Sequence, residues 1–312
     1  MDAHTLVYFH PDCLLHDTGA THPERADRVR AIHTHIKNNF SNEVLYQEAP
    51  LATLRQVSRV HPPSYIRFVL EKLHGSEKTY LDPDTIISSK SGDAAFRAAG
   101  AVCAAIDAVM DGAVSKAFCL TRPPGHHAEP TRAMGFCILN NVAIGALHAR
   151  HQHDIKRIAI IDFDVHHGNG TQRIFETDEN TLFISSHEMP LFPGTGSDSQ
   201  KGVGNILNIP LHPRASGEDF QKKWKLQGLP RLRAFQPELI LISAGFDGHR
   251  SDPLASINLT TEDYAWLTEE IVKVAEIFSK GRVISTLEGG YDLAALCESV
   301  AAHIMALKPS QS

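Results

Sequence analysis

Short apolar runs recur along most of this chain, and longer segments with the patterning of helices separate them. This alternation is typical of an α/β fold, in which helices connect the strands of a parallel sheet. The central runs are nearly unbroken Ile, Leu, Val and Phe, as expected for strands that are covered on both faces. The predicted strands are Leu6–Phe9, Ala117–Leu120, Ile158–Ile161, Leu182–Ser185, Ile206–Ile209, Leu239–Ile242 and Val283–Leu287.

The segments between these runs predict helices, some of them with recognisable start signals. Pro23 stands at the first turn of the first predicted helix, and residues 260–263 have the pattern of a capping box. No repeat or linker divides the chain, so we expect a single domain over residues 1–312, with the polar segment 76–93 as a surface excursion. The predicted helices are Glu24–Asn38, Pro63–Leu73, Asp93–Asp111, Asn141–His151, Gly217–Arg233, Thr261–Phe278 and Leu293–Leu307.

Charge and composition argue against several classes of protein. The formal net charge is -6 at pH 7, and nothing indicates a nucleic acid as the main partner. No stretch reaches the length of about 20 apolar residues that crosses a membrane, and the N-terminus lacks the features of a signal peptide. The five cysteines form no CxxC pair and their number is odd, so no disulfide framework is expected. We therefore expect a cytoplasmic protein.

Clusters of Gly, His, Asp and Tyr follow the C-terminal ends of predicted strands. In open α/β sheets this edge is where ligands bind, and unrelated loops would scatter such clusters over both edges. We therefore predict one convergent site. The clusters are residues 121–129 after Leu120, 162–170 after Ile161, 186–196 after Ser185, 243–247 after Ile242 and 288–291 after Leu287.

Three polar residues follow one of the most apolar strands. Asp162, Asp164 and His166 are two positions apart, so in an extended segment their side chains point the same way. An Asp-x-His pair alone is more often a simple hydrogen-bonded pair, but Asp247 adds a ligand from another strand end. Three protein ligands with an open position describe a catalytic zinc site, although carboxylate-rich ligation also suits iron(II).

Two adjacent histidines and one tyrosine are candidate catalytic groups. His126 and His127 could be surface residues in a chain with 19 histidines, but their loop is fixed by Pro123-Pro124-Gly125 and follows a buried strand. Near a metal they would serve as general base and acid, with Asp162 and Asn169 available to support their far nitrogens. Tyr291 follows two glycines and is either a packing residue or a donor to an oxyanion.

Two phenylalanines stand in glycine-flanked loops, where core packing would be their ordinary role. In these loops Phe136, after Gly135, and Phe192 could line a slot for an aliphatic stem. No GxSxG elbow, P-loop lysine motif or HExxH is present. The histidines that we assign to solvated helix faces or loops are His33, His35, His148, His151 and His153.

These residues resemble the histone deacetylase family of the arginase/deacetylase superfamily, and the pattern is most similar to its class II-like branch. The matching runs follow one collinear order over nearly the whole chain, which makes the resemblance highly specific. They are HPER from His22, RPPGHHAE from Arg122, GFCILNN from Gly135, DFDVHHGNGTQ from Asp162, LFPGTG from Leu191, SAGFDGHRSDPLA from Ser243 and LEGGYDL from Leu287. The resemblance implies a three-layer α/β/α fold with a mainly parallel sheet of about eight strands.

The resemblance also implies roles for individual residues. Asp164, His166 and Asp247 match the family's zinc ligands. The other matches are His126 and His127 as the pair that binds the attacking water, Asp162 and Asn169 as their partners, Tyr291 as the carbonyl-polarising group, and Gly135, Phe136 and Phe192 as the substrate tunnel. Asn169 stands where class I members carry Asp, and a neutral His127 is then the favoured resting state.

Monovalent cations accompany the zinc in this family. The resemblance implies a structural K⁺ or similar ion held by Asp162, Asp164 and His166 with the strand end at Ser185-Ser186. Many members bind a second cation, whose ligands would fall between Phe175 and Thr181. Arginase-like relatives bind two catalytic metals, but the positions of the additional carboxylates are Gly168 and His249 here, so a single catalytic ion is expected.

The implied activity is hydrolysis of an acetylated amine by a metal-activated water. An acetylated lysine side chain in a protein or peptide is the first expectation, an acetylated small amine such as a polyamine the second, and a non-catalytic acyl-lysine binder a remote third. Relatives specialised for polyamines can carry an acidic gatekeeper just after Asp252-Pro253, where this chain has Leu254. Glu129, Glu188 or residues 82–84 could still attract a second cationic group. The sequence leaves the oligomeric state open.

Overall fold

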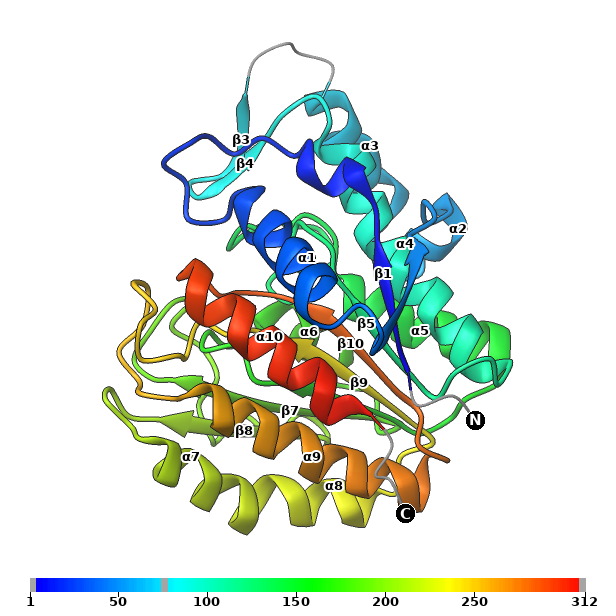
Figure 1. The fold of residues 1–312 in the computed structure, drawn as a ribbon. Coiled ribbons are helices and arrows are strands. Elements are labelled where there is room, and N and C mark those ends of the chain that lie inside the picture. The colour runs from blue at the N-terminus through cyan, green and yellow to red at the C-terminus, as the bar shows by residue number, and fades with distance from the viewer. Residues whose placement is uncertain (1–3, 74–77, 309–312) are drawn as a thin grey trace.

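The computed structural model describes residues 4–73 and 78–308. A single eight-stranded sheet runs through it in the order β2-β1-β5-β10-β9-β6-β7-β8, and every neighbouring pair is parallel (Figure 1). The strands of this sheet are β1 (Thr5–Phe9), β2 (Val44–Glu48), β5 (Lys116–Cys119), β6 (Ile158–Asp162), β7 (Thr181–Glu188), β8 (Ile206–Leu211), β9 (Leu239–Ala244) and β10 (Val283–Leu287). A separate antiparallel hairpin pairs β3 (Thr79–Asp82) with β4 (Thr85–Ile87).

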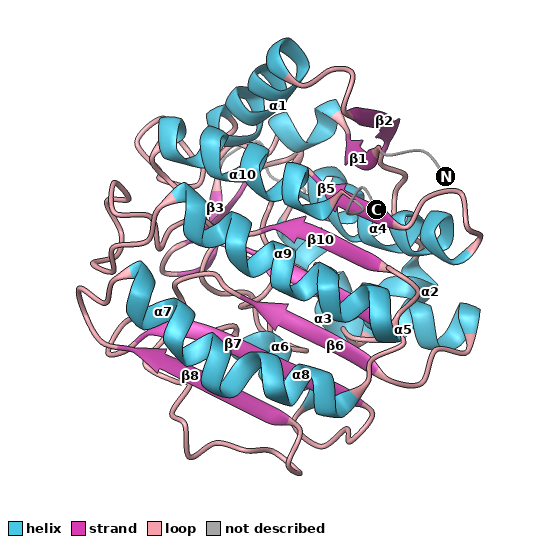
Figure 2. Ribbon diagram, turned by 60° about the horizontal axis from the view of Figure 1, so that its bottom comes forward, coloured by secondary structure: helices cyan, strands magenta, loops and turns pink. Residues whose placement is uncertain are grey.

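Helices lie on both faces of the sheet, as Figure 2 shows. One face is covered by α1 (Asp27–Asn39), α7 (Gly217–Lys223), α8 (Leu229–Phe235), α9 (Thr261–Phe278) and α10 (Leu293–Leu307), with a short π-helical turn at Trp224–Gly228 between α7 and α8. The other elements are a 3-10 turn at Pro11–Leu14, α2 (Leu54–Val57), α3 (Pro63–Lys72), α4 (Ser91–Met110), α5 (Asn141–His153) and α6 (Asn169–Phe175), of which α3, α4 and α5 pack on the opposite face.

Two hydrophobic cores result, one on each side of the sheet. Alternate residues of a strand point to opposite faces, so Ile161 and Ile242 belong to one core while Ile160 and Leu241 belong to the other. Every residue of β6, β7, β9 and β10 is buried. Burial on both faces explains why these strands are rich in Ile, Leu, Val and Phe.

The predicted three-layer fold is confirmed, and each predicted strand is present within three residues of its expected bounds. Strand β2 was not predicted because Val44 is its single buried residue, so the segment lacks a strand-like apolar run. The segment 76–93 is not a simple surface excursion, since Ile87 and Ser91 are buried there and α4 begins at Ser91. Residues 76 and 77 lie outside the described residues.

Two of the predicted helices differ from the structure for reasons that the local sequence explains. Helix α1 begins at Asp27, so Pro23 precedes it and does not occupy its first turn. The helix predicted over 217–233 is interrupted by the π-helical turn, where the Leu229 N–H donates to Trp224, five residues earlier. The next residue, Pro230, has no N–H to donate, which disfavours regular helical pairing at this point.

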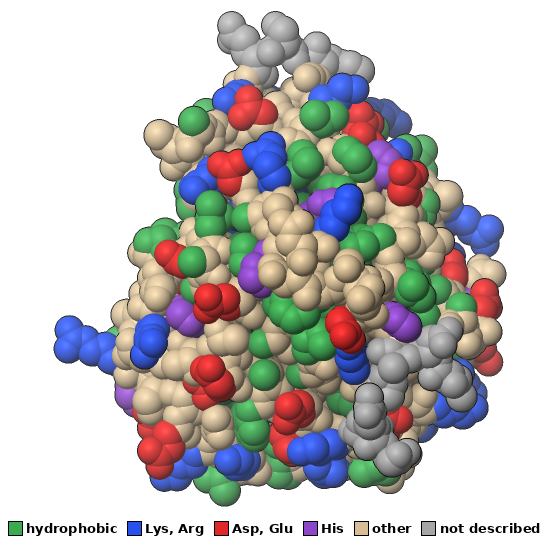
Figure 3. All heavy atoms as spheres, viewed as in Figure 1, with side chains coloured by type: hydrophobic (Ala, Val, Ile, Leu, Met, Phe, Trp, Pro, Cys, Tyr) green, Lys and Arg blue, Asp and Glu red, His purple; other side chains and the backbone are tan. Residues whose placement is uncertain are grey.

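The outer surface carries charges of both signs. On the face drawn in Figure 3, Lys and Arg side chains are interspersed with Asp and Glu. Among the described residues, no helix has the length and hydropathy needed to cross a membrane. His148 differs from its expected place on a solvated helix face: it is buried, and its Nε2 lies 2.8 Å from Asp107 Oδ1.

Candidate active site

The C-terminal ends of β6, β7 and β9 meet at one edge of the sheet. Asp162, the last residue of β6, is in register with Ser185 of β7 on one side and Ser243 of β9 on the other. The loops that follow these strands therefore start side by side. This arrangement brings residues 162–166 and Asp247 together, although 81 residues separate His166 from Asp247.

Asp164, His166 and Asp247 form a compact group of possible metal ligands. His166 Nδ1 lies 3.1 Å from Asp164 Oδ1 and 3.1 Å from Asp247 Oδ2. Both carboxylates are buried, and Asp247 uses its other oxygen to accept the Val165 N–H at 2.9 Å. One ligand atom from each residue lies within 4.8 Å of the others.

The electrostatics of this group call for a positive charge. Burial disfavours the imidazolium form, but hydrogen bonds to Asp164 and Asp247 outweigh it and raise the pKa of His166 to about 10. Burial and the charge of Asp164 raise the pKa of Asp247. Without a metal ion, one protonated imidazole would have to offset the charges of two buried carboxylates. The residues therefore fit a divalent metal ion with an open coordination position.

Glycines allow these groups to approach the backbone closely. A Cβ atom at Gly289 would lie 2.1 Å from Asp247 Oδ2, and the Gly289 N–H donates to Asp164 Oδ2 at 2.8 Å. A Cβ atom at Gly168 would lie 2.1 Å from Asp162 Oδ2. Neither position can take a side chain without displacing a carboxylate.

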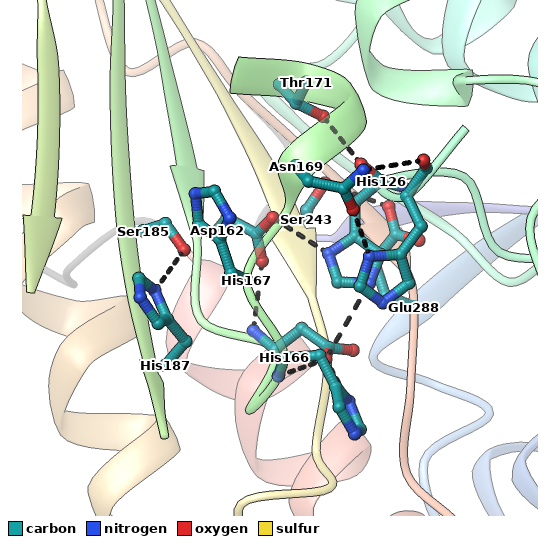
Figure 4. Close-up of polar contacts among 12 residues, drawn as sticks. His126, Asp162, His166, His167, Asn169, Thr171, Ser185, His187, Ser243 and Glu288 are labelled. Carbon is teal, nitrogen blue, oxygen red and sulfur yellow. Dashed lines mark hydrogen bonds and ion pairs between the residues drawn. The ribbon is translucent and has the colours of Figure 1, made fainter. Parts of the chain in front are cut away.

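His126 and His127 stand beside the metal-ligand group and have different partners. His126 Nδ1 lies 3.0 Å from Asp162 Oδ2, and His127 Nδ1 lies 2.8 Å from the amide oxygen of Asn169. Their ring centroids are 3.9 Å apart. Figure 4 shows how His126, Asp162 and Asn169 come together from a loop, a strand end and the first turn of α6.

The two histidines also differ in charge. Burial opposes protonation of His126, but the charges of Asp162 and Asp164 outweigh it and raise its pKa to about 10. Burial and the charges of His126 and His166 hold the pKa of His127 well below its usual range. His127 is therefore the neutral member of the pair, as expected for an imidazole beside an amide and not a carboxylate.

Glu288, which the sequence analysis did not assign a role, holds the histidine loop in place. Its Oε2 accepts the N–H groups of Gly125 and His126 at 2.6 and 3.2 Å, and its Oε1 accepts the Ser243 hydroxyl at 2.9 Å. It is fully buried, and burial raises its pKa to about 7. Its position in the sequence could have predicted a role, because Glu288 is a charged residue directly after the buried strand β10. Asp162 was identified by the same kind of position, at the end of a buried strand.

A cavity of about 240 Å³ leads to these groups. Phe136 and Phe192 line it, with Tyr291 and Leu254 nearby, and the Phe192 ring centroid lies 5.1 Å from that of His127. The complete lining is Asp84, Pro124, His126, His127, Gly135, Phe136, His166, Leu191, Phe192, Leu254, Gly289 and Tyr291. All the residues predicted for the tunnel therefore lie on its wall, together with the carboxylate of Asp84.

The β3–β4 hairpin supports one side of this cavity. Gly135 and Phe136 both have positive φ angles, 57° and 67°, which is unusual for phenylalanine. The Gly135 N–H donates to Asp84 Oδ1 at 3.1 Å, and the Phe136 N–H donates to the Thr85 hydroxyl at 3.2 Å. These bonds hold the strained backbone that directs the Phe136 ring to the cavity.

Tyr291 lies at the same wall and is held from two sides. Its N–H donates to Asp252 Oδ2 at 2.7 Å, and the Arg28 guanidinium lies 5.0 Å from the centre of its ring. Arg28 also donates to the carbonyl of Gly290 at 2.6 Å. Burial and the charge of Asp247 hold the pKa of Tyr291 well above its usual range, so its hydroxyl remains a donor.

Comparison with known proteins identifies the family of this chain. The family model "Histone deacetylase domain" matches residues 22–307. A probable deacetylase of Archaeoglobus fulgidus is 39% identical over 93% of this chain and 82% of its own. Human "Polyamine deacetylase HDAC10" is 34% identical over 97% of this chain and 48% of its own. "Type-2 histone deacetylase 2" of Dictyostelium discoideum is 38% identical over 97% of this chain, which spans only 21% of the length of that protein.

A solved structure, that of the HDA15 HD domain, superposes with a TM-score of 0.92 at 34% identity, covering 98% of this chain and 88% of that one. The fold and site thus define an amidohydrolase of the arginase/deacetylase fold. The chain belongs to the histone deacetylase family.

Proposed function

We propose that this protein is a zinc-dependent deacetylase that hydrolyses the amide of N-acetylated lysine side chains in proteins or peptides, and that residues 1–312 form its single deacetylase domain. The observation that carries the proposal is the group of Asp164, His166 and Asp247, of which His166 lines the same cavity as Phe136 and Phe192. An aliphatic stem between the two rings would present its amide to the ligand group.

Each neighbouring residue has a role in this proposal. Asp164, His166 and Asp247 would hold one zinc ion, which when bound supplies Lewis-acid chemistry to the amide carbonyl and to a water. His127, neutral and hydrogen-bonded through Nδ1, takes a proton on Nε2 as general base and returns it to the leaving amine. The Tyr291 hydroxyl donates to the oxyanion as the water adds to the carbonyl.

We propose a monovalent cation, K⁺ or a similar ion, beneath the zinc. The pairing of Asp162 with Ser185 places the end of β7 against the loop that carries Asp164 and His166, which supports this position. All five cysteines are free and buried, which supports a reducing compartment, and we infer the cytoplasm. Some relatives bear names that place them in chloroplasts, for example histone deacetylase 14 of Arabidopsis thaliana.

An acetylated polyamine is the second candidate substrate, and Asp84 is the observation that favours it. Of the carboxylates that could attract a second ammonium group, Glu129 and Glu188 do not line the cavity, whereas Asp84 does. Leu254 favours the acetyl-lysine proposal, because it supplies apolar contact and no charge at the cavity wall. Asp84 is half-buried and already accepts the Gly135 N–H, which reduces its availability to a cation.

The test is kcat/KM for an acetyl-lysine peptide against N-acetylspermidine and N-acetylputrescine, with metal content measured on the same sample. We expect the peptide to be preferred, and a preference of tenfold or more for the polyamine would overturn this. In that case Leu254→Glu would improve polyamine turnover little, because the matching charge would come from elsewhere. Binding of both substrates without turnover would identify an acyl-lysine binding protein instead.

A further inference from the structure

Three main-chain carbonyl oxygens converge on one point in the turn between α6 and β7. They belong to Phe175, Asp178 and Thr181, and the side-chain nitrogen of Asn205 lies at that point. Its Nδ2 atom is 2.7 Å from the first oxygen, 2.9 Å from the second and 2.8 Å from the third. Asn205, which directly precedes β8, is only 3% exposed.

Carbonyl groups arranged in this way concentrate partial negative charge in a buried place. Buried carbonyls require donors, and rings of carbonyls are the arrangement with which proteins replace the hydration shell of K⁺. A primary amide offers only two N–H groups. Three carbonyls around the one nitrogen of Asn205 therefore share two protons, so the nitrogen fills the centre of the turn as a small cation would.

The loop before β8 closes over the other end of this amide. Asn205 Oδ1 accepts the Val203 N–H at 3.2 Å, and a Cβ atom at Gly202 would lie 2.6 Å from the same oxygen. With Oδ1 and Nδ2 exchanged, an oxygen would face three acceptors and an NH₂ group would face an N–H. The hydrogen bonds thus fix the orientation with the nitrogen toward the carbonyls.

The second cation of the histone deacetylase family, expected between Phe175 and Thr181, does not fit these residues. Nitrogen-to-oxygen distances of 2.7–2.9 Å leave no room for an ion between the amide and the carbonyls. We propose that the side-chain amide of Asn205 takes the place of this cation. The turn after α6 is then held by a group of the chain itself and needs no K⁺.

The replacement of a cation by the Asn205 amide affects the candidate active site through α6. The helix begins at Asn169, the partner of His127, and ends at Phe175, whose carbonyl the Asn205 amide binds. The amide therefore fixes the C-terminal end of a helix of seven residues whose first residue orients the proposed general base. The order of this helix should not depend on the salt present.

Crystals soaked in thallium(I), a K⁺ mimic with a strong anomalous signal, test the proposal directly. The unsubstituted protein should show no anomalous peak within coordination distance of the Phe175, Asp178 and Thr181 carbonyls. Asn205→Ala should gain a peak there, since it keeps the carbonyls and removes the amide. A peak at these carbonyls in the unsubstituted protein would overturn the proposal, as would the absence of one in a folded Asn205→Ala variant.

Thermal unfolding in KCl and in tetramethylammonium chloride at equal ionic strength provides a second test that needs no crystals. Potassium should raise the Tm of Asn205→Ala by about 2–4 °C more than it raises the Tm of the unsubstituted protein, because a ligand that binds only the folded state stabilises it. Asn180→Ala, which removes an exposed asparagine of the same turn, is the matched control and should respond like the unsubstituted protein. Equal responses of all three proteins to potassium would overturn the proposal.

Discussion

The amide oxygen of Asn169 lies 2.8 Å from Nδ1 of His127, and a second contact fixes which end of the amide faces the ring. Asn169 Nδ2 donates to Glu129 Oε1 at 3.1 Å, so its oxygen must point to the imidazole. His127 Nδ1 therefore carries the proton, and Nε2 keeps the lone pair. Since the acceptor is uncharged, nothing in this contact stabilises an imidazolium as a carboxylate would.

Asn169→Asp should move the pH profile of the enzyme. A carboxylate at Nδ1 favours the charged imidazolium, so the pKa of His127 rises from its lowered position. If neutral His127 takes the proton from the water, the acidic limb of kcat/KM must shift to higher pH. The pH dependence of kcat/KM on an acetyl-lysine peptide measures this. Glu129→Gln, which keeps an acceptor for Asn169, should leave the limb in place, and superimposable profiles for Asn169→Asp would remove His127 as the base.

Tyr291→Phe should reduce deacetylation strongly while leaving the metal bound. The loss of one oxyanion donor lowers kcat by about 10²–10³-fold. Steady-state kinetics with metal analysis of the same sample would check both parts. Tyr80→Phe, which removes the hydroxyl of an exposed tyrosine that does not line the cavity, is the control and should keep full activity. A near-normal rate for Tyr291→Phe would make Tyr291 a packing residue.

The catalytic site should hold one divalent metal ion per chain and not two. A second ion would need a carboxylate at position 168, but a Cβ atom there would already lie 2.1 Å from Asp162 Oδ2. Elemental analysis of the purified protein should give about one equivalent of zinc or iron, since three protein ligands leave one ion with an open position. Two anomalous peaks a few ångströms apart at Asp164 and Asp247 would contradict this and reopen a ureohydrolase activity.

Glu288 should act as a positioning residue for the histidine loop. Glu288→Ala leaves the N–H groups of Gly125 and His126 without their acceptor, which should lower the free energy of unfolding by about 2–3 kcal/mol and reduce kcat more than it raises KM. Glu288→Gln retains one oxygen as acceptor and should restore most of both losses. Chemical denaturation and kinetics on the two variants decide the matter: equal kcat for Glu288→Ala and the unsubstituted protein would limit Glu288 to a structural role.

The sequence predicted those parts of the fold and site in which burial and strand direction determine the outcome. Strands such as β6 are covered on both faces, so their apolar runs were recognisable, and the carboxyl ends of parallel strands meet at one edge. For that reason the sequence alone predicts that Asp164, His166 and Asp247 lie together. Family resemblance supplied what spacing does not reveal, such as the pairing of His127 with Asn169.

The remaining features depend on contacts that no local pattern encodes. The β3–β4 hairpin supports Phe136 through Asp84 and Thr85, yet its residues alternate too irregularly to predict a strand pair. His148 was assigned to a solvated face, but it is buried against α4, where Asp107 accepts its hydrogen bond. The amide of Asn205 binds carbonyls 24 to 30 residues earlier, a relationship visible only in three dimensions.

The all-parallel sheet has a consequence for how the chain would acquire the proposed metal ion. His166 follows β6 and Asp247 follows β9, so Asp247 is synthesised 81 residues after His166. The two strands are adjacent, and parallel neighbours require long crossovers, so their pairing is a slow, long-range folding event. When α6 has left the ribosome, the nascent chain contains two of the three proposed ligands, and Asp247 has not yet been synthesised. The complete ligand group can therefore form only after β9 has joined β6 in the central sheet.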